Sequence, residues 1–389
     1  MRILNVNGTL DPVWGGGGAE RTRRLSTALA RQGHKVTVLT SAIGNAASDS
    51  PCLDGVRVVV LRCLNKRFMV PMLPIARLRE LIRDNDIVHL TGHWSVLNSV
   101  MYLLSRVERT PYVVSPVGTL PLFGRSQILK YIYNMIIGGA LIRNAQAHVA
   151  VTRSEAEQFA DYSVTGNISI IPNGVDAESF AEIDSTSFRA HHGLGDAPII
   201  LFMGRLNPIK GPDLLLEAFG RVAEKFPSYV LVFAGPDEGM KDSLGKAAIR
   251  YGIAEQVKFV GHLGGEDKTA AYRAATLLVI PSRMEAMSIV VLEGGAAGTP
   301  ALITDQCGFN EIEKIGGGQV VGAEAGAIAD GLAEMLSDTD GLLRAGKKLC
   351  DLVRREFTWD VAALRLSAIF ESVVQSSQDL PHARKIKER

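Results

Sequence analysis

Residues 277–293 read Leu-Leu-Val-Ile-Pro-Ser-Arg-Met-Glu-Ala-Met-Ser-Ile-Val-Val-Leu-Glu. The first four residues predict a buried β-strand, and the apolar run after Ser288 predicts a helix. Glu285 then lies in the loop between strand and helix, and Glu293 lies about two turns into the helix. A strand that passes through a short loop into a helix is the repeating unit of parallel α/β sheets. This stretch therefore predicts an α/β fold with functional groups at the carboxyl end of a strand.

The same alternation of short apolar strands and helical patterns extends along the chain in both directions. We expect strands at residues 3–6, 36–39, 56–61, 87–90, 112–115, 148–151, 199–203, 229–234, 257–260, 277–280 and 301–304. We expect helices at residues 19–32, 212–225 and 361–374. Apolar strands that are each followed by a helix are typical of doubly wound parallel sheets.

The chain has 389 residues, which is more than one ordinary domain holds. A turn cluster, Ile-Pro-Asn-Gly-Val-Asp at residues 171–176, interrupts the pattern near the middle. We predict two Rossmann-like domains, at residues 1–176 and 177–360, that face each other across a cleft. Residues 361–389 are expected to form a C-terminal helix that crosses back to the first domain, followed by a polar tail.

Composition narrows the cellular setting. Hydrophobic residues make up 47% of the chain and the formal net charge is +1, so bulk charge gives no reason to expect nucleic-acid binding. The four cysteines, at positions 52, 63, 307 and 350, form no Cys-x-x-Cys pair and are predicted to be free thiols. The N-terminus lacks a signal pattern, and no segment reaches the roughly 18 apolar residues of a membrane span. We expect a cytoplasmic protein.

Charge is distributed unevenly. Residues 1–178 hold 19 Lys and Arg against 13 Asp and Glu, a net charge of +6, whereas the remainder carries −5. A basic first domain could meet anionic lipid at the inner face of a membrane or an anionic acceptor, and ordinary solvated arginines are the alternative. The apolar stretch at residues 128–142 is interpreted as a core helix, with a position on a membrane surface as the alternative.

The two glutamates suit sugar recognition. Glu285 precedes a helix and can fold over its N-terminus, where free backbone N–H groups attract an anion. One carboxylate can accept hydrogen bonds from sugar hydroxyls while Glu293 accepts them from ribose hydroxyls. The alternative is that Glu285 caps the helix and Glu293 is a solvated helix residue.

A second group of residues follows the strand at 199–203, in Gly-Arg-Leu-Asn-Pro-Ile-Lys-Gly at residues 204–211. Arg205 and Lys210 place two cations on a glycine-bounded loop at a carboxyl strand end, where open α/β sheets bind their ligands. Arginine can bind a phosphate through two N–H groups, and lysine adds a point charge. The pair suits a diphosphate leaving group, and a surface loop with two solvated cations is the alternative.

The first domain offers a glycine-rich loop and a histidine. The loop at residues 15–18, which includes Gly16 and Gly17, lets the backbone approach a ligand and feeds a helix that begins near Ala19. Its spacing does not fit Gly-x-Gly-x-x-Gly, which argues against a nicotinamide cofactor. His93 follows the strand at 87–90 and therefore lies at a carboxyl edge, whereas His89 is expected in the core.

Together these motifs resemble the retaining glycosyltransferase family 4, whose members have the GT-B fold. The resemblance covers the glycine loop and residues 171–176, 204–211, 260–262 and 281–311. It implies that Glu285 holds the donor sugar, Glu293 the ribose, and Arg205 with Lys210 the diphosphate. It also implies that Val260, Gly261 and His262 contact the base and that His93 contacts the sugar near the reacting centre.

Two positions depart from the family pattern. Cys307 replaces the first glycine of the Gly-Gly-x-x-Glu loop, which leaves ligand contact by this loop open. Val117 stands where the family often carries histidine, so that side-chain contact is absent.

A metal site is not expected. Asp84-Asn85-Asp86 and Asp338-Thr339-Asp340 imitate a metal-binding Asp-x-Asp motif, but neither follows a predicted strand, and turn or cap roles account for them. Arg205 and Lys210 would neutralise the leaving group in place of a metal, with no cofactor besides the nucleotide-sugar co-substrate.

The resemblance predicts transfer of a sugar from a nucleoside-diphosphate donor to a glycan or lipid-linked acceptor hydroxyl, with retention of configuration. Bacterial surface or exopolysaccharide synthesis is the expected setting. A nucleotide-sugar epimerase of related fold and a non-catalytic nucleotide-binding protein remain the alternatives.

Overall fold

The computed structural model divides the chain into two compact units. Unit 1 comprises Met1–Gly174 with Trp359–Arg389, and unit 2 comprises Val175–Thr358. The structure describes residues 1–42, 53–65, 70–122, 126–180 and 184–378. Cys52 and most of the predicted polar tail lie outside these residues.

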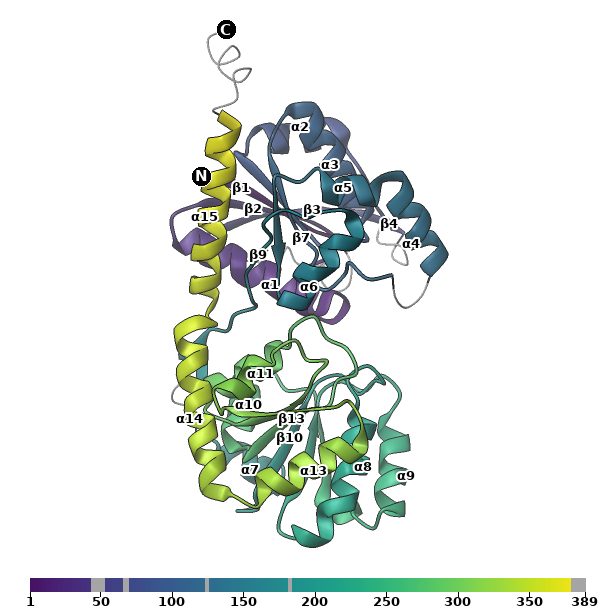
Figure 1. The fold of residues 1–389 in the computed structure, drawn as a ribbon, viewed down its shortest axis with the longest axis vertical. Helices are drawn as coiled ribbons and strands as arrows, with labels where there is room; N and C mark the ends of the chain where they lie inside the picture. Colours follow the sequence, from purple (N-terminus) through teal and green to yellow (C-terminus); the bar gives the residue numbers. More distant parts are fainter. Residues whose placement is uncertain (43–52, 66–69, 123–125, 181–183, 379–389) are drawn as a thin grey trace. The chain divides into compact units, whose positions relative to one another are not determined.

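Unit 1 is built on a parallel sheet of seven strands in the order β3-β2-β1-β6-β7-β8-β9 (Figure 1). The strands are Arg2–Asn7 (β1), Lys35–Ser41 (β2), Val56–Leu61 (β3), Ile87–Thr91 (β6), Tyr112–Ser115 (β7), Ala147–Ala150 (β8) and Ser169–Ile170 (β9). A separate antiparallel pair joins Cys63–Asn65 (β4) and Val70–Pro71 (β5). Every residue of β6 and β7 is buried, because helices cover both faces of such a sheet.

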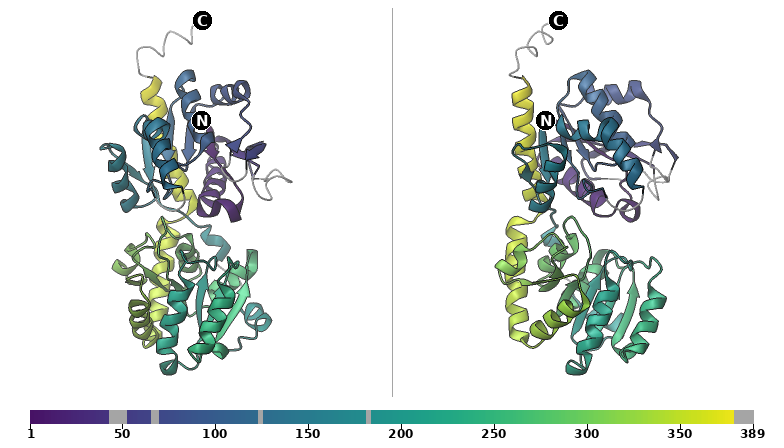
Figure 2. Two further views of the ribbon diagram at one scale, coloured as in Figure 1. Left: turned by 90° about the vertical axis from the view of Figure 1, so that its right-hand side faces the viewer. Right: turned by 45° about the vertical axis from the view of Figure 1, so that its right-hand side comes forward.

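Most helices of unit 1 cover the faces of this sheet, whereas α4 lies at its periphery (Figures 1 and 2). They are Pro12–Arg31 (α1), Ile75–Arg83 (α2), Val96–Glu108 (α3), Gln127–Tyr133 (α4), the π-helix Asn134–Gly138 (η2), Gly139–Arg143 (α5), Arg153–Gln158 (α6), the 3₁₀ helix Phe159–Tyr162 (η3) and Trp359–Gln378 (α15). The predicted C-terminal helix is thus α15. It packs along α1, where Arg31 forms an ion pair with Asp360 at 3.1 Å and His34 contacts Ser367 at 2.8 Å.

Two expectations for unit 1 were wrong. The glycine segment is not an open loop before a helix: α1 already begins at Pro12 and is interrupted at Gly16, whose φ of 49° and ψ of −138° are non-helical. The stretch at residues 128–142 is helical throughout, as α4, η2 and α5, but it is not a core helix, because α4 has no buried residue. Only its last part, around Leu141 and Ile142, reaches the core.

Unit 2 repeats the architecture with a parallel sheet of six strands in the order β12-β11-β10-β13-β14-β15. The strands are Ile199–Met203 (β10), Val230–Ala234 (β11), Val257–Gly261 (β12), Leu277–Ile280 (β13), Ala301–Thr304 (β14) and Gly318–Val321 (β15). The helical elements are Ala177–Phe180 (η4), Thr186–His191 (α7), Pro212–Val222 (α8), Ala223–Lys225 (η5), Lys241–Arg250 (α9), Ala254–Gln256 (η6), Gly265–Ala274 (α10), Ile289–Ala296 (α11), Glu311–Lys314 (α12), Ala325–Leu336 (α13) and Thr339–Glu356 (α14).

Each sheet reverses its strand order once. In unit 1 the reversal lies between β1 and β6, and in unit 2 it lies between β10 and β13. At such a switch point the loops after the two strands diverge, and ligands of open α/β sheets bind there. The glycine segment and His93 follow β1 and β6, while Lys210 and Glu285 follow β10 and β13. All of these candidate residues therefore flank a switch point of their own unit.

A buried arginine anchors the end of unit 1. Arg21 of α1 is 1% exposed and donates to the carbonyl oxygens of Ile171 and Pro172 and to Oδ1 of Asn173, at 2.8 to 3.0 Å. Burial lowers the pKa of the Arg21 guanidinium to about 10. The first half of the turn cluster predicted at residues 171–176 is thus fixed to α1 immediately before Gly174, where the chain passes from unit 1 into unit 2.

Candidate functional site

Two loops of unit 2 are in direct contact at the switch point, because the residue at the contact is a glycine. Gly211 has a φ of 67°, and a Cβ added to it would lie 2.1 Å from the carbonyl oxygen of Pro281. Any other residue would be strained in this left-handed conformation and would also collide with that carbonyl. The backbone N–H of Arg283 donates to the carbonyl of Ile209 at 2.8 Å, which joins the loops again. The β10–α8 loop and the β13–α11 loop are therefore held in direct contact.

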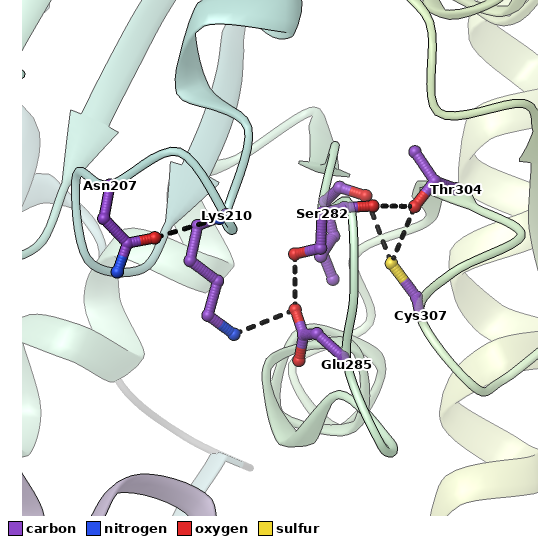
Figure 3. A network of polar contacts seen from close by, with 7 residues as sticks. Asn207, Lys210, Ser282, Glu285, Thr304 and Cys307 are labelled. Carbon is purple, nitrogen blue, oxygen red and sulfur yellow. Dashed lines mark hydrogen bonds and ion pairs between the residues drawn. The ribbon is translucent and has the colours of Figure 1, made fainter. Parts of the chain in front are cut away.

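This contact brings Lys210 and Glu285 together (Figure 3). Lys210 Nζ lies 2.9 Å from Glu285 Oε1, and Ser282 Oγ donates to the same oxygen at 2.5 Å. The Glu285 side chain is 10% exposed and the Lys210 side chain 23% exposed. Among the described residues no hydrogen bond or ion pair reaches Glu285 Oε2. The carboxylate is thus oriented through one oxygen and retains the other as an acceptor.

Arg205 lies in a neighbouring cluster. Its guanidinium forms an ion pair with Glu238 at 2.9 Å, and Asn207 Nδ2 donates to the other oxygen of Glu238 at 2.7 Å. The Asn207 hydrogen bond, followed by that of Arg205, lowers the pKa of the Glu238 carboxyl. Asn207 Oδ1 also accepts the backbone N–H of Lys210 at 3.0 Å. The structure therefore connects the two predicted cations through Asn207 rather than by direct contact with a common partner.

Glu293 is fixed by two residues of α10. Tyr272 donates its hydroxyl to Glu293 Oε2 at 2.7 Å, and Lys268 Nζ lies 2.6 Å from Oε1. Burial raises the pKa of Tyr272 well above its ordinary value, and the negative charges of Glu293 and Glu285 raise it further. Glu285 lies in the loop that leads into α11 and Glu293 lies within α11, so both predicted carboxylates belong to one strand–loop–helix unit.

The loop that carries Cys307 supports the backbone beside Glu285. The N–H of Glu285 donates to the carbonyl of Gln306 at 2.9 Å, and the N–H of Ser288 donates to that of Cys307 at 3.0 Å. The Cys307 thiol is fully buried 3.3 Å from the carbonyl of Ile280, and burial raises its pKa to about 12. Its side chain faces the protein interior (Figure 3), so this loop positions the β13–α11 loop through its backbone.

The start of α11 has unused hydrogen-bonding capacity. Ser288 is the residue before the helix, is fully buried, and its hydroxyl bonds to no partner. The first N–H groups of a helix lack partners within the helix and carry partial positive charge. Together with Lys210, these groups form a region suited to an anion.

The predicted base-binding residues end the edge strand β12. Gly261 has a φ of 77° and its carbonyl accepts the N–H of Gly235 at 2.7 Å. Val260 is half-buried and His262 is exposed. No hydrogen bond within the described part of unit 2 joins them to Lys210 or Glu285, so they stand apart from that pair at the same edge of the sheet.

In unit 1, His93 is enclosed by other side chains. It is 1% exposed, its Nε2 lies 2.7 Å from Oδ1 of Asn134, and its ring packs against those of Trp94, Tyr133 and Tyr162. Burial lowers the pKa of the imidazole to about 4, so it is neutral near pH 7. Its Nδ1 is buried and bonds to no partner.

The glycine segment has open space beside its backbone. Gly16 has a positive φ, and a Cβ added there would meet no atom within 4 Å. Gly17 is exposed. The backbone of this segment is therefore accessible to a ligand on the side where a side chain would project.

The two Asp-x-Asp sequences have structural partners. Asp86 forms an ion pair with Arg2 at 2.7 Å, and Asp338 caps α14 by accepting the N–H of Gly341 at 2.8 Å. Across the residues that the structure describes, no group of three or more His, Cys, Asp or Glu side chains could hold a metal ion. Within the same residues no helix is long and apolar enough to cross a membrane.

Sequence reasoning missed several supporting residues: Asn207, Glu238, Lys268, Tyr272, Ser282, Ser288 and Asn134. Lys268 and Tyr272 are four residues apart in the sequence, a spacing that places two side chains on one face of a helix such as α10. Their partner Glu293 is distant in sequence, and no local pattern indicates it.

Comparisons with known proteins identify the family to which the chain is related. Residues 15–179 match the family described as Glycosyltransferase Family 4, and residues 184–349 match Glycosyl transferases group 1. A D-inositol 3-phosphate glycosyltransferase of Nocardia farcinica is 34% identical over 217 residues, which cover 53% of this chain and 48% of that protein. The D-inositol 3-phosphate glycosyltransferase 1 of Catenulispora acidiphila is 30% identical over 327 residues, 77% of this chain and 75% of that protein.

Solved structures share the fold. The Anabaena protein HepE, solved in complex with UDP and glucose, superposes with a TM-score of 0.77 at 18% identity over 96% of this chain and 100% of that chain. Sucrose-phosphate synthase from Thermosynechococcus elongatus superposes with a TM-score of 0.76 at 19% identity over 97% of this chain and 100% of that chain.

Proposed function

This chain belongs to glycosyltransferase family 4 and has the GT-B fold, and from that premise we propose that it transfers a sugar from a nucleoside-diphosphate donor with retention of anomeric configuration. The observation that carries the proposal is the Lys210–Glu285 ion pair, oriented by Ser282 at the switch point of unit 2. It pairs a cation for phosphate with a carboxylate that keeps one oxygen for sugar hydroxyls.

Unit 2 supplies the groups that a sugar nucleotide needs. Glu285 Oε2 would accept sugar hydroxyls, and Glu293, oriented by Lys268 and Tyr272, would accept ribose hydroxyls. The bound UDP of HepE belongs to that protein and supports a nucleoside diphosphate as the class of ligand here. Val260, Gly261 and His262 are the residues we assign to the base.

Charge on the leaving diphosphate grows as the glycosidic bond breaks. Lys210, the free N–H groups at the start of α11 and the buried Ser288 hydroxyl would stabilise that charge. Arg205 can join them by exchanging Glu238 for phosphate, because its side chain is 43% exposed. These cations serve where other enzymes use a metal, so we propose a metal-independent reaction without a further cofactor.

The reaction that we propose is a same-face substitution. The acceptor oxygen forms its bond to the anomeric carbon as the carbon–phosphate oxygen bond breaks, and the departing phosphate takes the acceptor proton. From unit 1 we assign His93 to the sugar, and the backbone of Gly16 and Gly17 to close approach of a ligand. A neutral His93 donates or accepts a hydrogen bond without adding charge.

The acceptor that we propose is a glycan or a lipid-linked sugar of bacterial surface or exopolysaccharide synthesis, used in the cytoplasm at the inner face of a membrane. The charge of +6 on residues 1–178 supports contact with anionic lipid.

The anomer of the product tests the proposal. Incubation of the full chain with nucleoside-diphosphate sugars and candidate acceptors, followed by NMR of the product, should show the donor's anomeric configuration. An inverted product rejects retention. Conversion of the donor to another sugar nucleotide without acceptor indicates an epimerase instead, and tight binding without turnover under all conditions indicates a non-catalytic protein.

A further inference from the structure

One segment of unit 1 directs its apolar side chains toward solvent. Large apolar side chains are exposed throughout α4 and the first half of η2: Ile128, Leu129, Tyr131, Ile132, Met135 and Ile136. We call these six residues the α4 surface. Their spacing follows one face of a helix, which in a soluble protein normally faces the core. In Figures 1 and 2, α4 projects at the edge of unit 1.

The opposite face of the segment is fixed by polar contacts. The Tyr133 hydroxyl donates to the carbonyl of His93 at 2.9 Å and lies 2.8 Å from Ser99 Oγ. Asn134 bonds to the His93 ring and donates to the Tyr162 hydroxyl at 3.0 Å. Turning the apolar face inward would break these contacts, so its exposure is part of the folded structure.

The charge around the segment is positive. The segment itself, residues 126–143, contains Lys130 and Arg143 and no acidic residue, and the nearest acidic residue before it in the chain is Glu108. Glu108 is paired with Arg79 and Arg83, both at 2.5 Å. Arg143 is exposed at the end of α5, and Lys130 of α4 lies over the Trp94 ring at 5.2 Å. An apolar helical face with basic neighbours and almost no negative charge fits the interface of an anionic bilayer.

We propose that the α4 surface inserts into the headgroup region of an anionic lipid bilayer. Binding to the bilayer does not depend on the proposed function. Only the purpose of that binding, the use of a lipid-linked acceptor, rests on it. Because Tyr133 and Asn134 join this segment to the His93 loop, the docked surface lies beside the residue assigned to the sugar. A lipid-borne acceptor would therefore enter unit 1 next to His93.

Vesicle co-sedimentation of the full chain tests this surface. The wild type should sediment with vesicles of phosphatidylcholine and phosphatidylglycerol, and less with phosphatidylcholine alone or at high salt. The triple variant Ile128→Ser, Met135→Ser and Ile136→Ser removes the side chains that are 77%, 72% and 75% exposed. Its partition coefficient should fall at least about tenfold, because interfacial binding scales with buried apolar area.

The control removes two apolar side chains of similar exposure from unit 2. Leu343→Ser with Ile249→Ser, at positions 72% and 69% exposed, should leave sedimentation unchanged. The proposal is overturned if the triple variant sediments like the wild type or if the wild type does not sediment with anionic vesicles. It is also overturned if light scattering shows that the wild type is a dimer and the triple variant a monomer, since a second copy would then cover the surface. Nucleotide binding, measured separately without lipid, reports on the proposed function alone.

Discussion

The two units use one architecture for different chemistry. In unit 2 the switch point holds a partly exposed pair of opposite charges, Lys210 and Glu285, with hydrogen-bonding capacity left over. In unit 1 the corresponding position holds His93, neutral, buried and enclosed by aromatic rings. A doubly wound sheet therefore fixes where a site lies, and the side chains at that edge decide what it binds.

The contrast has a physical basis. Charged leaving groups need charges that are already oriented, and unit 2 orients them through Ser282, Asn207 and Tyr272. Unit 1 instead holds a neutral imidazole among aromatic rings, which can donate or accept a hydrogen bond without adding charge. The experiments below test this difference between the two units.

The largest effect is expected from the cation of unit 2. Lys210→Ala removes the point charge nearest Glu285 and should lower donor turnover about 10²–10³-fold, the usual loss when one stabilising donor is removed from a developing negative charge. Release of nucleoside diphosphate measures it. Lys246→Ala, which changes an exposed lysine of α9, is the control and should retain wild-type turnover. Equal turnover in both variants would remove Lys210 from the site.

The next effect concerns the contact between the two loops. Gly211→Ala adds a Cβ in a left-handed conformation against the Pro281 carbonyl and should destabilise unit 2 by about 3 kcal/mol. Gly245→Ala, in the interior of α9 with no atom within 4 Å, should instead be neutral or stabilise by up to about 1 kcal/mol.

Denaturation followed by far-UV circular dichroism, which detects the loss of the helices and strands of unit 2, measures this difference. A Gly211→Ala protein as stable as the Gly245→Ala protein would contradict the close approach.

The smallest effect is a pH dependence in unit 1. The folded-state pKa of His93 is about 4, below the ordinary 6.5, so the unfolded chain binds this proton first as pH falls. The stability conferred by neutral His93 is complete above pH 6.5 and is lost between about pH 6.5 and 4. Between pH 7 and pH 5 the loss is about 2 kcal/mol.

Denaturation monitored by tryptophan fluorescence should show this loss in the wild type. His89 carries a pKa lowered in the same direction by burial, so it contributes to the total. The His93 share is the part that disappears in His93→Gln. An identical pH dependence in the two proteins would show that His93 is not buried in its neutral form.

The sequence allowed the strands to be placed well. Those expected at residues 112–115, 199–203, 277–280 and 301–304 have the observed bounds, because continuous apolar runs mark doubly covered strands. The short edge strands β9 and β15 were missed, since β9 has only two residues and β15 is half-buried and begins with glycine.

The candidate site was only partly predictable. Glu285 and Lys210 were found because each follows a strand, and their contact depends on Gly211, which the pattern includes. The partners Glu238 and Lys268 come from distant segments that the fold brings in, and no local signal identifies them. The direction of the α4 surface was predicted wrongly, because helical periodicity defines a face without saying whether that face meets the core or the solvent.

Calorimetric titration of the full chain with UDP, GDP and ADP tests the central claim most directly, namely that the carboxyl edge of unit 2 binds a nucleoside diphosphate. One nucleotide should bind the wild type, and Glu293→Ala should weaken it about tenfold or more, because a charged hydrogen-bond acceptor is lost. Glu266→Ala, which alters an exposed carboxylate of α10, should bind like the wild type. Absence of binding by all three nucleotides, or equal affinity in Glu293→Ala, would contradict the account.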